Sequence, residues 1–300
     1  MAEKKRIMYI LRVFPQTSET YIKSEIEAVR GDYDLKVISM DEPDLPCDTD
    51  MPFERLTEPE PIREAIEDFK PHVLHAHWLK QIRLLSSLAR ETDTPFTIRS
   101  HSFDVLQGAG GSRRGLKALL GKKRSPYVEG AGPLANDELC LGILCFPFAR
   151  PLLEDAGMKS EKIHESWPVV AFDRFFDRSA NGEAVMNTGA CLPKKKMDDF
   201  IELAAMTREM KFNLYPLGFD VDKISALNQS KGGPVQIMAP FHPNEMPFEY
   251  KKHRWLVYTA SKEKGTVGWP VAVAEAQASG VGVCMPNLRP DLKEYVGEAG

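Results

Sequence analysis

KGTVGWPVAVAEAQASGVG, residues 264–282, is the stretch around which the rest of the chain is organised. A Gly-Trp-Pro turn leads into a helix of small residues that carries one carboxylate, Glu275, and ends at Gly280. Pro270 suits the first turn of a helix, where a missing N–H costs nothing, and glycine suits the position after the last turn. Free N–H groups and the helix dipole attract anions to such a start. The stretch therefore predicts a helix packed closely on a sheet, with an anion site and one carboxylate nearby.

The composition is typical of a soluble globular protein of two domains. The chain has 300 residues, of which 43% are hydrophobic and 27% charged, and one core rarely serves so long a chain. The net charge of −4 argues against a general nucleic-acid binder, which is normally basic. No apolar run approaches the roughly 18 residues of a membrane span, and no signal-peptide pattern opens the chain. The five cysteines form no CxxC pair, so we expect reduced thiols and no zinc site.

Short apolar strands alternate with amphipathic helices through the first half of the chain. Arg6–Val13 (RIMYILRV) predicts a buried strand, residues 18–30 a helix, and residues 71–78 a further strand. Residues 127–146 are interpreted as two or three short strands. Such alternation predicts a parallel sheet covered by helices on both faces.

A second alternation of strands and helices follows a polar stretch. We expect a first domain over residues 1–172, a linker over residues 173–183 and a second domain over residues 184–300. The predicted fold class is α/β, with two parallel-sheet domains and a cleft between them. Ligands of such folds bind at the carboxyl ends of the strands.

Five stretches, in the right order along the chain, resemble one enzyme family. They are residues 14–26 (FPQTSETYIKSEI), 72–78 (HVLHAHW), 97–105 (TIRSHSFDV), 188–204 (TGACLPKKKMDDFIELA) and 264–282. The last resembles a motif that runs roughly E-G-F-G-x-P-x-x-E-A-x-A-x-G. Together they resemble the retaining GT-B glycosyltransferases of family 4, of the type that builds polysaccharides.

This resemblance implies both an architecture and an activity. The fold would be GT-B, with two Rossmann-like domains, acceptor side first and donor side second, and a short or truncated second domain because the chain ends at Gly300. The enzyme would transfer a hexose, with retention, from a UDP- or GDP-sugar to a glycan or lipid-linked acceptor. It would work in the cytoplasm, by a front-face mechanism, without a metal or cofactor. A catalytically impaired sugar-nucleotide or glycan binder and a nucleotide-sugar epimerase are the alternatives.

In two places the chain departs from the family pattern. A glutamate is expected eight positions before Glu275, where this chain has Val267. The family's arginine on the first donor-domain strand falls on Ala190. Glu263 or Thr266 is expected to take over the missing sugar contact, and the residues leave that choice open.

The resemblance assigns three further residues to the donor. It implies that Glu275 accepts hydrogen bonds from the ribose hydroxyls, that Gly268 lies at the diphosphate, and that Lys195 offers positive charge to it. In the competing interpretation, Glu275 is a solvated helix carboxylate and Lys195 belongs to a solvated helix start.

On the acceptor side, the resemblance points to His101 and Asp104 as catalytic residues and to Ser18 and Glu19 as acceptor contacts. His101 would lie near the reacting carbon, where its carbonyl or its ring stabilises developing positive charge. A capping histidine followed by a turn at Asp104 is the competing interpretation. Ser18 is also a candidate helix cap, as is Thr17, and the residues support a cap better than an acceptor contact.

Two more histidines, His75 and His77, alternate along the strand predicted at residues 71–78. We expect them to face opposite sides of the sheet and interpret both as satisfied core groups. No spacing of His, Asp and Glu resembles a metal site.

A basic segment lies between the predicted catalytic loop and residue 125. Three leucines at helical spacing, Leu116, Leu119 and Leu120, give it one apolar stripe. The helix is predicted either to turn this stripe to the core or to lie peripherally on an anionic membrane surface. Its cationic residues are Arg113, Arg114, Lys117, Lys122, Lys123 and Arg124.

Overall fold

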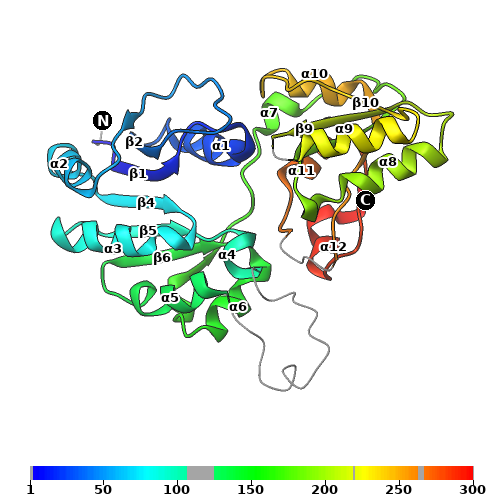
Figure 1. Cartoon of the computed structure of the whole chain (residues 1–300). Helices are drawn as coiled ribbons and strands as arrows, with labels where there is room; N and C mark the ends of the chain where they lie inside the picture. The colour runs from blue at the N-terminus through cyan, green and yellow to red at the C-terminus, as the bar shows by residue number, and fades with distance from the viewer. Residues whose placement is uncertain (1–2, 107–124, 219, 263–266, 300) are drawn as a thin grey trace. The chain divides into compact units, whose positions relative to one another are not determined.

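The computed structural model describes residues 3–106, 125–218, 220–262 and 267–299. The chain divides into two compact units, Met1–Val169 and Val170–Gly300, and each contains one parallel sheet with helices (Figure 1). The predicted α/β class with two parallel sheets is confirmed. Among the described residues, no helix has both the length and the hydropathy needed to cross a membrane.

Unit 1 contains a seven-stranded sheet in the order β3-β2-β1-β4-β5-β6-β7. Every neighbouring pair is parallel, as the predicted strand–helix alternation requires. The strands are β1 (Arg6–Val13), β2 (Asp34–Asp41), β3 (Glu54–Arg55), β4 (Val73–His77), β5 (Phe96–Arg99), β6 (Cys140–Cys145) and β7 (Ile163–Glu165).

Helices cover both faces of this sheet, and β1 shows why. Met8 and Ile10 pack in one core, whereas Tyr9 and Leu11 pack in another, because successive side chains of a strand point to opposite faces. The second core includes Ile22 and other residues of α1. The helices of unit 1 are α1 (Thr20–Val29), α2 (Pro59–Phe69), α3 (Ile82–Glu91), α4 (Ser102–Leu106), α5 (Pro126–Ala135) and α6 (Arg150–Asp155).

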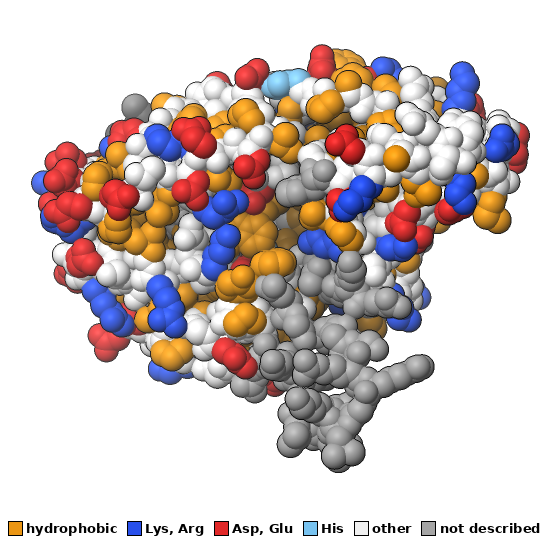
Figure 2. All heavy atoms as spheres, in the orientation of Figure 1, with side chains coloured by type: hydrophobic (Ala, Val, Ile, Leu, Met, Phe, Trp, Pro, Cys, Tyr) orange, Lys and Arg blue, Asp and Glu red, His pale blue; other side chains and the backbone are white. Residues whose placement is uncertain are grey.

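Helix α2 illustrates how the sequence pattern places these elements. Its buried face carries Ile62 and Ile66, one turn apart, and its outer face carries exposed glutamates. The exposed glutamates include Glu60, Glu64 and Glu67. Figure 2 shows acidic side chains gathered over this part of the first unit.

The prediction of two or three strands over residues 127–146 is wrong, because α5 occupies the first part of that range. Ser125 caps the helix by accepting the Tyr127 N–H, and Pro126 occupies the first turn. A Cβ atom at Gly132 would lie only 3.1 Å from the Ala156 carbonyl oxygen, so the small residues serve close packing of a helix. Only β6 remains as a strand.

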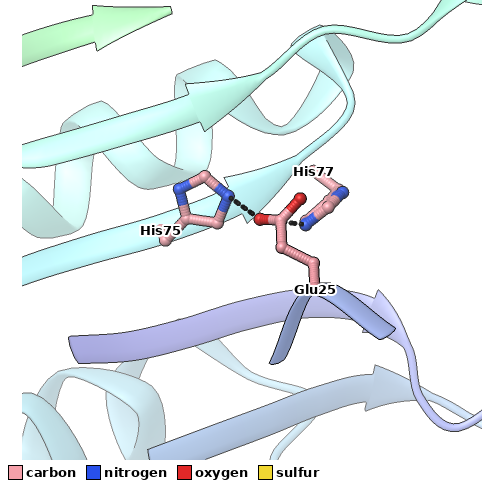
Figure 3. A group of neighbouring side chains, drawn as sticks. All are labelled: Glu25, His75 and His77. Carbon is pink, nitrogen blue, oxygen red and sulfur yellow. Dashed lines mark ion pairs between the residues drawn. The ribbon is translucent and has the colours of Figure 1, made fainter. Parts of the chain in front are cut away.

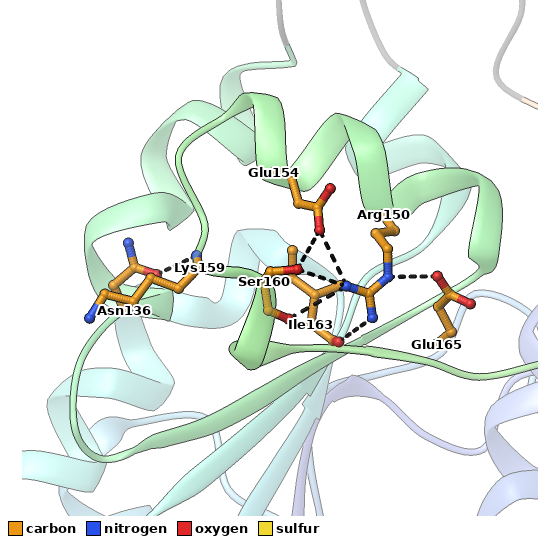
Figure 4. A network of polar contacts seen from close by, with 7 residues as sticks. All are labelled: Asn136, Arg150, Glu154, Lys159, Ser160, Ile163 and Glu165. Atoms are coloured by element: carbon orange, nitrogen blue, oxygen red, sulfur yellow. Dashed lines mark hydrogen bonds and ion pairs between the residues drawn. The ribbon is translucent and has the colours of Figure 1, made fainter.

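Arg150 braces the corner where β6 turns through α6 into β7. Its Nε donates to Glu165 at 2.6 Å, and its Nη2 donates to the Ile163 carbonyl at 2.6 Å (Figure 4). Ser160 and Glu154 complete the cluster, with the Ser160 hydroxyl donating to Glu154 at 2.7 Å. This network is structural and lies at the end of the sheet, on its last strand.

Unit 2 contains a five-stranded sheet in the order β10-β9-β8-β11-β12, again parallel throughout. Its strands are β8 (Ala184–Ala190), β9 (Phe212–Leu217), β10 (Val235–Ile237), β11 (His253–Val257) and β12 (Gly282–Cys284). Its helices are α7 (Phe172–Phe175), α8 (Met197–Met206), α9 (Val221–Ser230), α10 (Met246–Lys251), α11 (Val271–Ala278) and α12 (Asp291–Val296).

The residues expected to form a linker begin with part of a helix. Phe175, at the end of α7, is 2% exposed and packs in the core that also contains Tyr250 and Val273. The Ser279 hydroxyl donates to the Phe175 carbonyl at 3.1 Å. Helix α7 is therefore anchored within unit 2.

Candidate functional site

Helix α11 forms within residues 264–282, the stretch whose sequence predicts a helix of small residues. Pro270 precedes its first residue in extended conformation, and Gly280 follows its end with φ 70°. The helix follows β11, so its start lies beyond the carboxyl end of that strand. Val273 and Ala276 are fully buried in the core of unit 2, which confirms close packing against the sheet.

Glu275 is partly buried on α11. Its Oε2 accepts a 3.0 Å hydrogen bond from the hydroxyl of Tyr250, which is itself completely buried on α10. Burial raises the pKa of Glu275 to about 7, although the Tyr250 hydrogen bond and the Arg174 charge act in the opposite direction. The carboxyl group is therefore held in place, in contrast to a freely solvated helix glutamate.

The Gly-Trp-Pro turn before α11 is braced by the segment that follows β12. The Trp269 indole donates to Asp291 at 2.7 Å and stacks on the Tyr295 ring at 5.0 Å and 6°. The Tyr295 hydroxyl donates to the Pro270 carbonyl at 2.8 Å. Arg289 donates to the Val267 carbonyl and pairs with Asp291 at 2.8 Å. Gly268 thus lies in a turn whose two neighbours are fixed.

The Val267 side chain is 3% exposed and packs in the core. The position where the family pattern has a glutamate is therefore an apolar core position here. Glu263 and Thr266, the predicted replacements, lie outside the described residues.

Lys195 follows β8, the neighbour of β11 in the sheet. Its Nζ donates to the Tyr258 hydroxyl and lies 4.3 Å from the centroid of the Tyr258 ring. Burial lowers the pKa of Lys195 to about 8, and burial together with the Lys195 charge lowers that of Lys194 to about 8. No carboxylate in the described part of the chain forms an ion pair with Lys195, so its charge is suited to an incoming anion.

Two hydrogen bonds join the loops that carry these groups. The Ser261 N–H donates to the Lys194 carbonyl at 2.8 Å, and the Thr259 hydroxyl donates to the Lys195 carbonyl at 2.7 Å. The loops after β8 and β11 therefore meet at the carboxyl edge of the sheet, where α/β folds bind ligands. Lys195, Gly268 and Glu275 all follow these two strands.

In unit 1, His101 and Asp104 lie together after β5. Asp104 Oδ2 accepts the N–H of His101 at 2.9 Å and the N–H of Leu79 at 3.0 Å, so it ties the turn after β5 to the turn after β4. Asp104 is completely buried, and burial raises its pKa to about 6 against these two hydrogen bonds. The His101 carbonyl accepts the N–H groups of Asp104 and Val105 at 3.0 and 3.4 Å. The His101 carbonyl is therefore already engaged by two backbone donors.

The prediction that His75 and His77 face opposite sides is wrong. Residues two apart in a strand share a face, and both Nε2 atoms point to Glu25 of α1, 3.4 Å from its Oε1 (Figure 3). Arg99 Nε lies 2.7 Å from the other oxygen of Glu25. This buried cluster was missed, and the spacing His-x-His on one strand was the available signal.

Trp78 adds an aromatic surface beside His101. Its ring centroid lies 4.3 Å from that of His101, and the Tyr21 ring centroid lies 5.1 Å from that of His101. Trp78 has φ 75° and ψ 123°, a backbone conformation that L-residues rarely adopt. Strain of this kind costs about 1–3 kcal/mol and concentrates at functional sites.

Ser18 and Glu19 belong to a 3-10 turn, Thr17–Glu19, that precedes α1. Neither Ser18 nor Thr17 caps this turn or α1, so the cap prediction is wrong; the Ser18 hydroxyl accepts a bond from the Gln16 amide at 3.0 Å instead. Burial raises the pKa of Glu19, while Arg12, Lys80 and a hydrogen bond from Trp78 act in the opposite direction. Glu19 is thus brought beside Trp78.

The basic helix predicted over residues 113–124 lies outside the described residues.

No protein-family model and no curated protein sequence matches the chain. Several solved structures match it over most of its length. Anabaena Alr3699/HepE in complex with UDP-glucose is 12% identical, with a TM-score of 0.69, over 93% of this chain and 80% of that one. Sucrose-phosphate synthase from Thermosynechococcus elongatus is 10% identical, with a TM-score of 0.70, over 94% and 81%. A glycosyltransferase from Rickettsia africae is 12% identical, with a TM-score of 0.61, over 95% and 79%.

At such low identities these matches establish the fold alone. The chain has the GT-B fold of glycosyltransferases, built from two Rossmann-like parallel sheets, and this prediction is confirmed.

Proposed function

We propose that this protein is a retaining glycosyltransferase that moves a hexose from a nucleotide-sugar donor to a glycan or lipid-linked acceptor. The observation that carries the proposal is Lys195, a partly buried lysine without a carboxylate partner among the described residues. It lies at the same sheet edge as the turn before α11. Structures of HepE with UDP-glucose and with UDP, on the same fold, support a nucleotide-sugar ligand.

On the donor side, we assign the diphosphate to Lys195 and the turn at Gly268, and the ribose to Glu275. A leaving nucleotide gains negative charge in the transition state, and a fixed cation lowers that barrier. Lys195 supplies this charge in the protein itself, so the proposal needs neither a metal ion nor a cofactor. With Ala190 in place of the family's arginine, the adjacent Lys194 is the second cation.

On the acceptor side, we assign chemistry to the ring of His101 and positioning to Asp104, with Ser18 and Glu19 as acceptor contacts. In a front-face reaction the acceptor hydroxyl attacks from the side on which the diphosphate leaves, so no covalent nucleophile is required. We assign the acceptor side to residues 1–172, the linker to residues 173–183 and the donor side to residues 184–300.

Donor binding and turnover test the proposal. A panel of UDP- and GDP-sugars is screened by thermal shift, because a ligand that binds the folded state raises its melting temperature. The best donor is then incubated with candidate acceptors, and the anomeric configuration of the product is read by NMR. Lys195→Met and Glu275→Ala should each abolish the thermal shift. Lys223→Met, at a lysine that pairs with Asp220 on the surface of α9, is the matched control.

Val267 favours one alternative, a binder that holds the nucleotide sugar without transferring it. The core position of its side chain removes the carboxylate that would contact the sugar. Donor binding that depends on Glu275, with no turnover on any acceptor, would support this alternative over transfer. Isomerised donor in the absence of acceptor would instead indicate an epimerase.

We also propose a cytoplasmic location with peripheral membrane contact through residues 113–124. Basic residues near an anionic surface contribute about 1 kcal/mol each. Sedimentation with anionic vesicles should pull the protein down, and salt should weaken this. Equal binding to neutral and anionic vesicles would refute the contact.

A further inference from the structure

A chain of buried side chains in unit 1 links a carboxylate to His101. His77 Nδ1 lies 3.0 Å from His101 Nε2, and the two rings stack with centroids 5.2 Å apart. On its other side, His77 Nε2 lies 3.4 Å from Glu25 Oε1 (Figure 3). His77 is 1% exposed and His101 is 6% exposed. One imidazole therefore stands between Glu25 and His101, sheltered from water.

The carboxylate at the start of this chain is ionised. Burial alone would raise the pKa of Glu25. Its neighbours hold the pKa well below the usual range: His77 first, then hydrogen bonding from His75 and His77, and then the Arg99 charge. Arg99 is the partner whose charge is permanent, and its Nε lies 2.7 Å from Oε2 with its side chain 6% exposed. A carboxylate anion has only acceptor atoms.

This charge determines where the hydrogens lie along the chain. A nitrogen that faces a carboxylate anion carries a hydrogen, so His77 has N–H at Nε2. Burial lowers the pKa of His77, which favours the neutral ring. A neutral ring with its hydrogen on Nε2 has a bare acceptor at Nδ1, 3.0 Å from His101 Nε2. The atom that faces this acceptor, His101 Nε2, is then the donor.

We propose that Glu25 and His77 are positioning residues that hold His101 in the tautomer with hydrogen on Nε2 and an unprotonated Nδ1. His101 Nδ1 can then accept the hydrogen of a sugar hydroxyl, which the other tautomer could not do. This use of Nδ1 rests on the proposed transferase function, whereas the tautomer itself does not. His75 has the same arrangement of hydrogens. Its Nε2 faces Glu25, and its Nδ1 can accept from the Thr97 hydroxyl, which lies 2.8 Å away.

A metal ion is the competing occupant of the cluster. Glu25, His75 and His77 offer ligand atoms that lie within 4.8 Å of one another. Arg99 argues against this, because its guanidinium already neutralises Glu25 and would repel a divalent cation beside it. We therefore favour the chain from Glu25 through His77 to His101 and treat metal binding as an outcome of the test.

Nitrogen-15 NMR of the full chain with labelled histidine reads the tautomer directly. Long-range proton–nitrogen correlations distinguish a protonated Nε2 from a protonated Nδ1, and the His101 signals are those lost in His101→Gln. We expect hydrogen on His101 Nε2 in the wild-type protein. Hydrogen on Nδ1 would overturn the proposal, and this measurement requires no variant in the network to fold.

Glu25→Gln tests the cause, because an amide can donate to His77 Nε2 and release the other tautomer. A second set of His101 signals is expected in this variant. Glu27→Gln, on the same helix and paired with Lys23 at 3.5 Å, is the matched control and should leave the spectrum unchanged. A single, unaltered His101 tautomer in Glu25→Gln would overturn the role of Glu25.

Two further arms separate the remaining outcomes. If one equivalent of zinc shifts the His75 and His77 signals and raises the melting temperature, the cluster is a metal site and the proposal fails. If the enzyme transfers sugar, Glu25→Gln should lower kcat by about 10²-fold, in the range of general acid–base contributions, with little change in the donor KM. An unchanged kcat despite mixed tautomers would overturn the positioning role. Absence of transfer by the wild-type protein would instead refute the proposed function and leave the tautomer result intact.

Discussion

The hydroxyl of Tyr250 donates to the carboxyl group of Glu275 at 3.0 Å, so a fully buried tyrosine on α10 orients the acidic side chain of α11. The same hydroxyl lies 3.2 Å from the Ala272 carbonyl, one turn earlier in α11. Tyr250 thus fixes both the helix and its carboxylate. The bond engages Oε2, and a carboxylate oxygen has a further lone pair for a ribose hydroxyl. A helix glutamate in solvent would lack this orientation.

Glu275→Gln should be more stable than the wild-type protein at pH 8, and this advantage should be smaller at pH 5. The pKa of Glu275 is raised to about 7 in the folded state, so the folded state binds more protons than the unfolded state between about pH 4.5 and 7. The contribution of this group to the free energy of unfolding therefore falls as pH rises through that window. Glutamine removes the effect and can still accept the Tyr250 hydrogen bond.

Urea unfolding at the two pH values measures this difference. The gain of Glu275→Gln over wild type should grow by about 1–3 kcal/mol from pH 5 to pH 8. Glu202→Gln, at a half-exposed glutamate of α8 that pairs with Lys231, serves as the control and should show no such growth. An equal difference at both pH values would contradict the raised pKa.

Nucleotide-sugar affinity should weaken from pH 7 to pH 9. The pKa of Lys195 is lowered to about 8, so the lysine loses its charge over this interval and its attraction for a diphosphate falls. Calorimetric titration with the donor should show a loss of up to about tenfold, the factor for one pKa unit above the midpoint. Lys195→Arg keeps the charge at both pH values and should flatten the dependence. A slope unchanged in this variant would point to Lys194, whose pKa is also lowered to about 8.

Much of the fold could be predicted because its strands are fully buried and bounded by turns. The apolar run RIMYILRV became β1 (Arg6–Val13) with the predicted bounds. Residues 127–146 failed because apolar residues and glycines there serve a helix that packs closely, and periodicity alone does not separate a short buried helix from a strand. The deciding signal was the Ser125-Pro126 start, which the prediction passed over.

The candidate site could be predicted only where its residues lie within one stretch of sequence. Glu25 and His77 are brought together by strand order, since α1 packs on the face of the sheet that carries the strand histidines. Their partnership depends on which strands are neighbours, and no local pattern encodes that. Tyr250 and Glu275 meet for the same reason. In this protein, the residues that hold a site in place are harder to predict from the sequence than the residues that they hold.

Asp104→Ala should destabilise unit 1 far more than Asp104→Asn. One buried oxygen of Asp104 accepts two backbone N–H groups, from Leu79 and His101, and alanine leaves both without a partner. The expected loss is about 2–5 kcal/mol, because each orphaned buried donor costs about 1–3 kcal/mol. Asparagine keeps one carbonyl oxygen at this position and should retain most of the stability. Urea unfolding at pH 7 compares the two, and equal losses would show that the charge of Asp104, rather than its acceptor oxygen, joins the turns.

Trp269→Phe should weaken donor binding through the turn before α11 while preserving the fold. Phenylalanine keeps an aromatic ring against Tyr295 but removes the indole N–H that donates to Asp291 at 2.7 Å. Loss of this charge-assisted hydrogen bond should lower the free energy of unfolding by about 1.5–3 kcal/mol. The turn that contains Gly268 would move more freely in this variant, and a bound diphosphate would have to order it again. The donor Kd should therefore rise several-fold, with little change in the rate of the chemical step.

Trp255→Phe is the matched control for this last experiment, since Trp255 lies on β11 in the same unit and its side chain is 42% exposed. Urea unfolding and donor titration are run on both variants. A higher donor Kd in Trp269→Phe alone ties the brace to binding. If stability falls in Trp269→Phe while the donor Kd equals that of Trp255→Phe, then Trp269 and Asp291 support the core of unit 2 only, and the diphosphate does not depend on this turn.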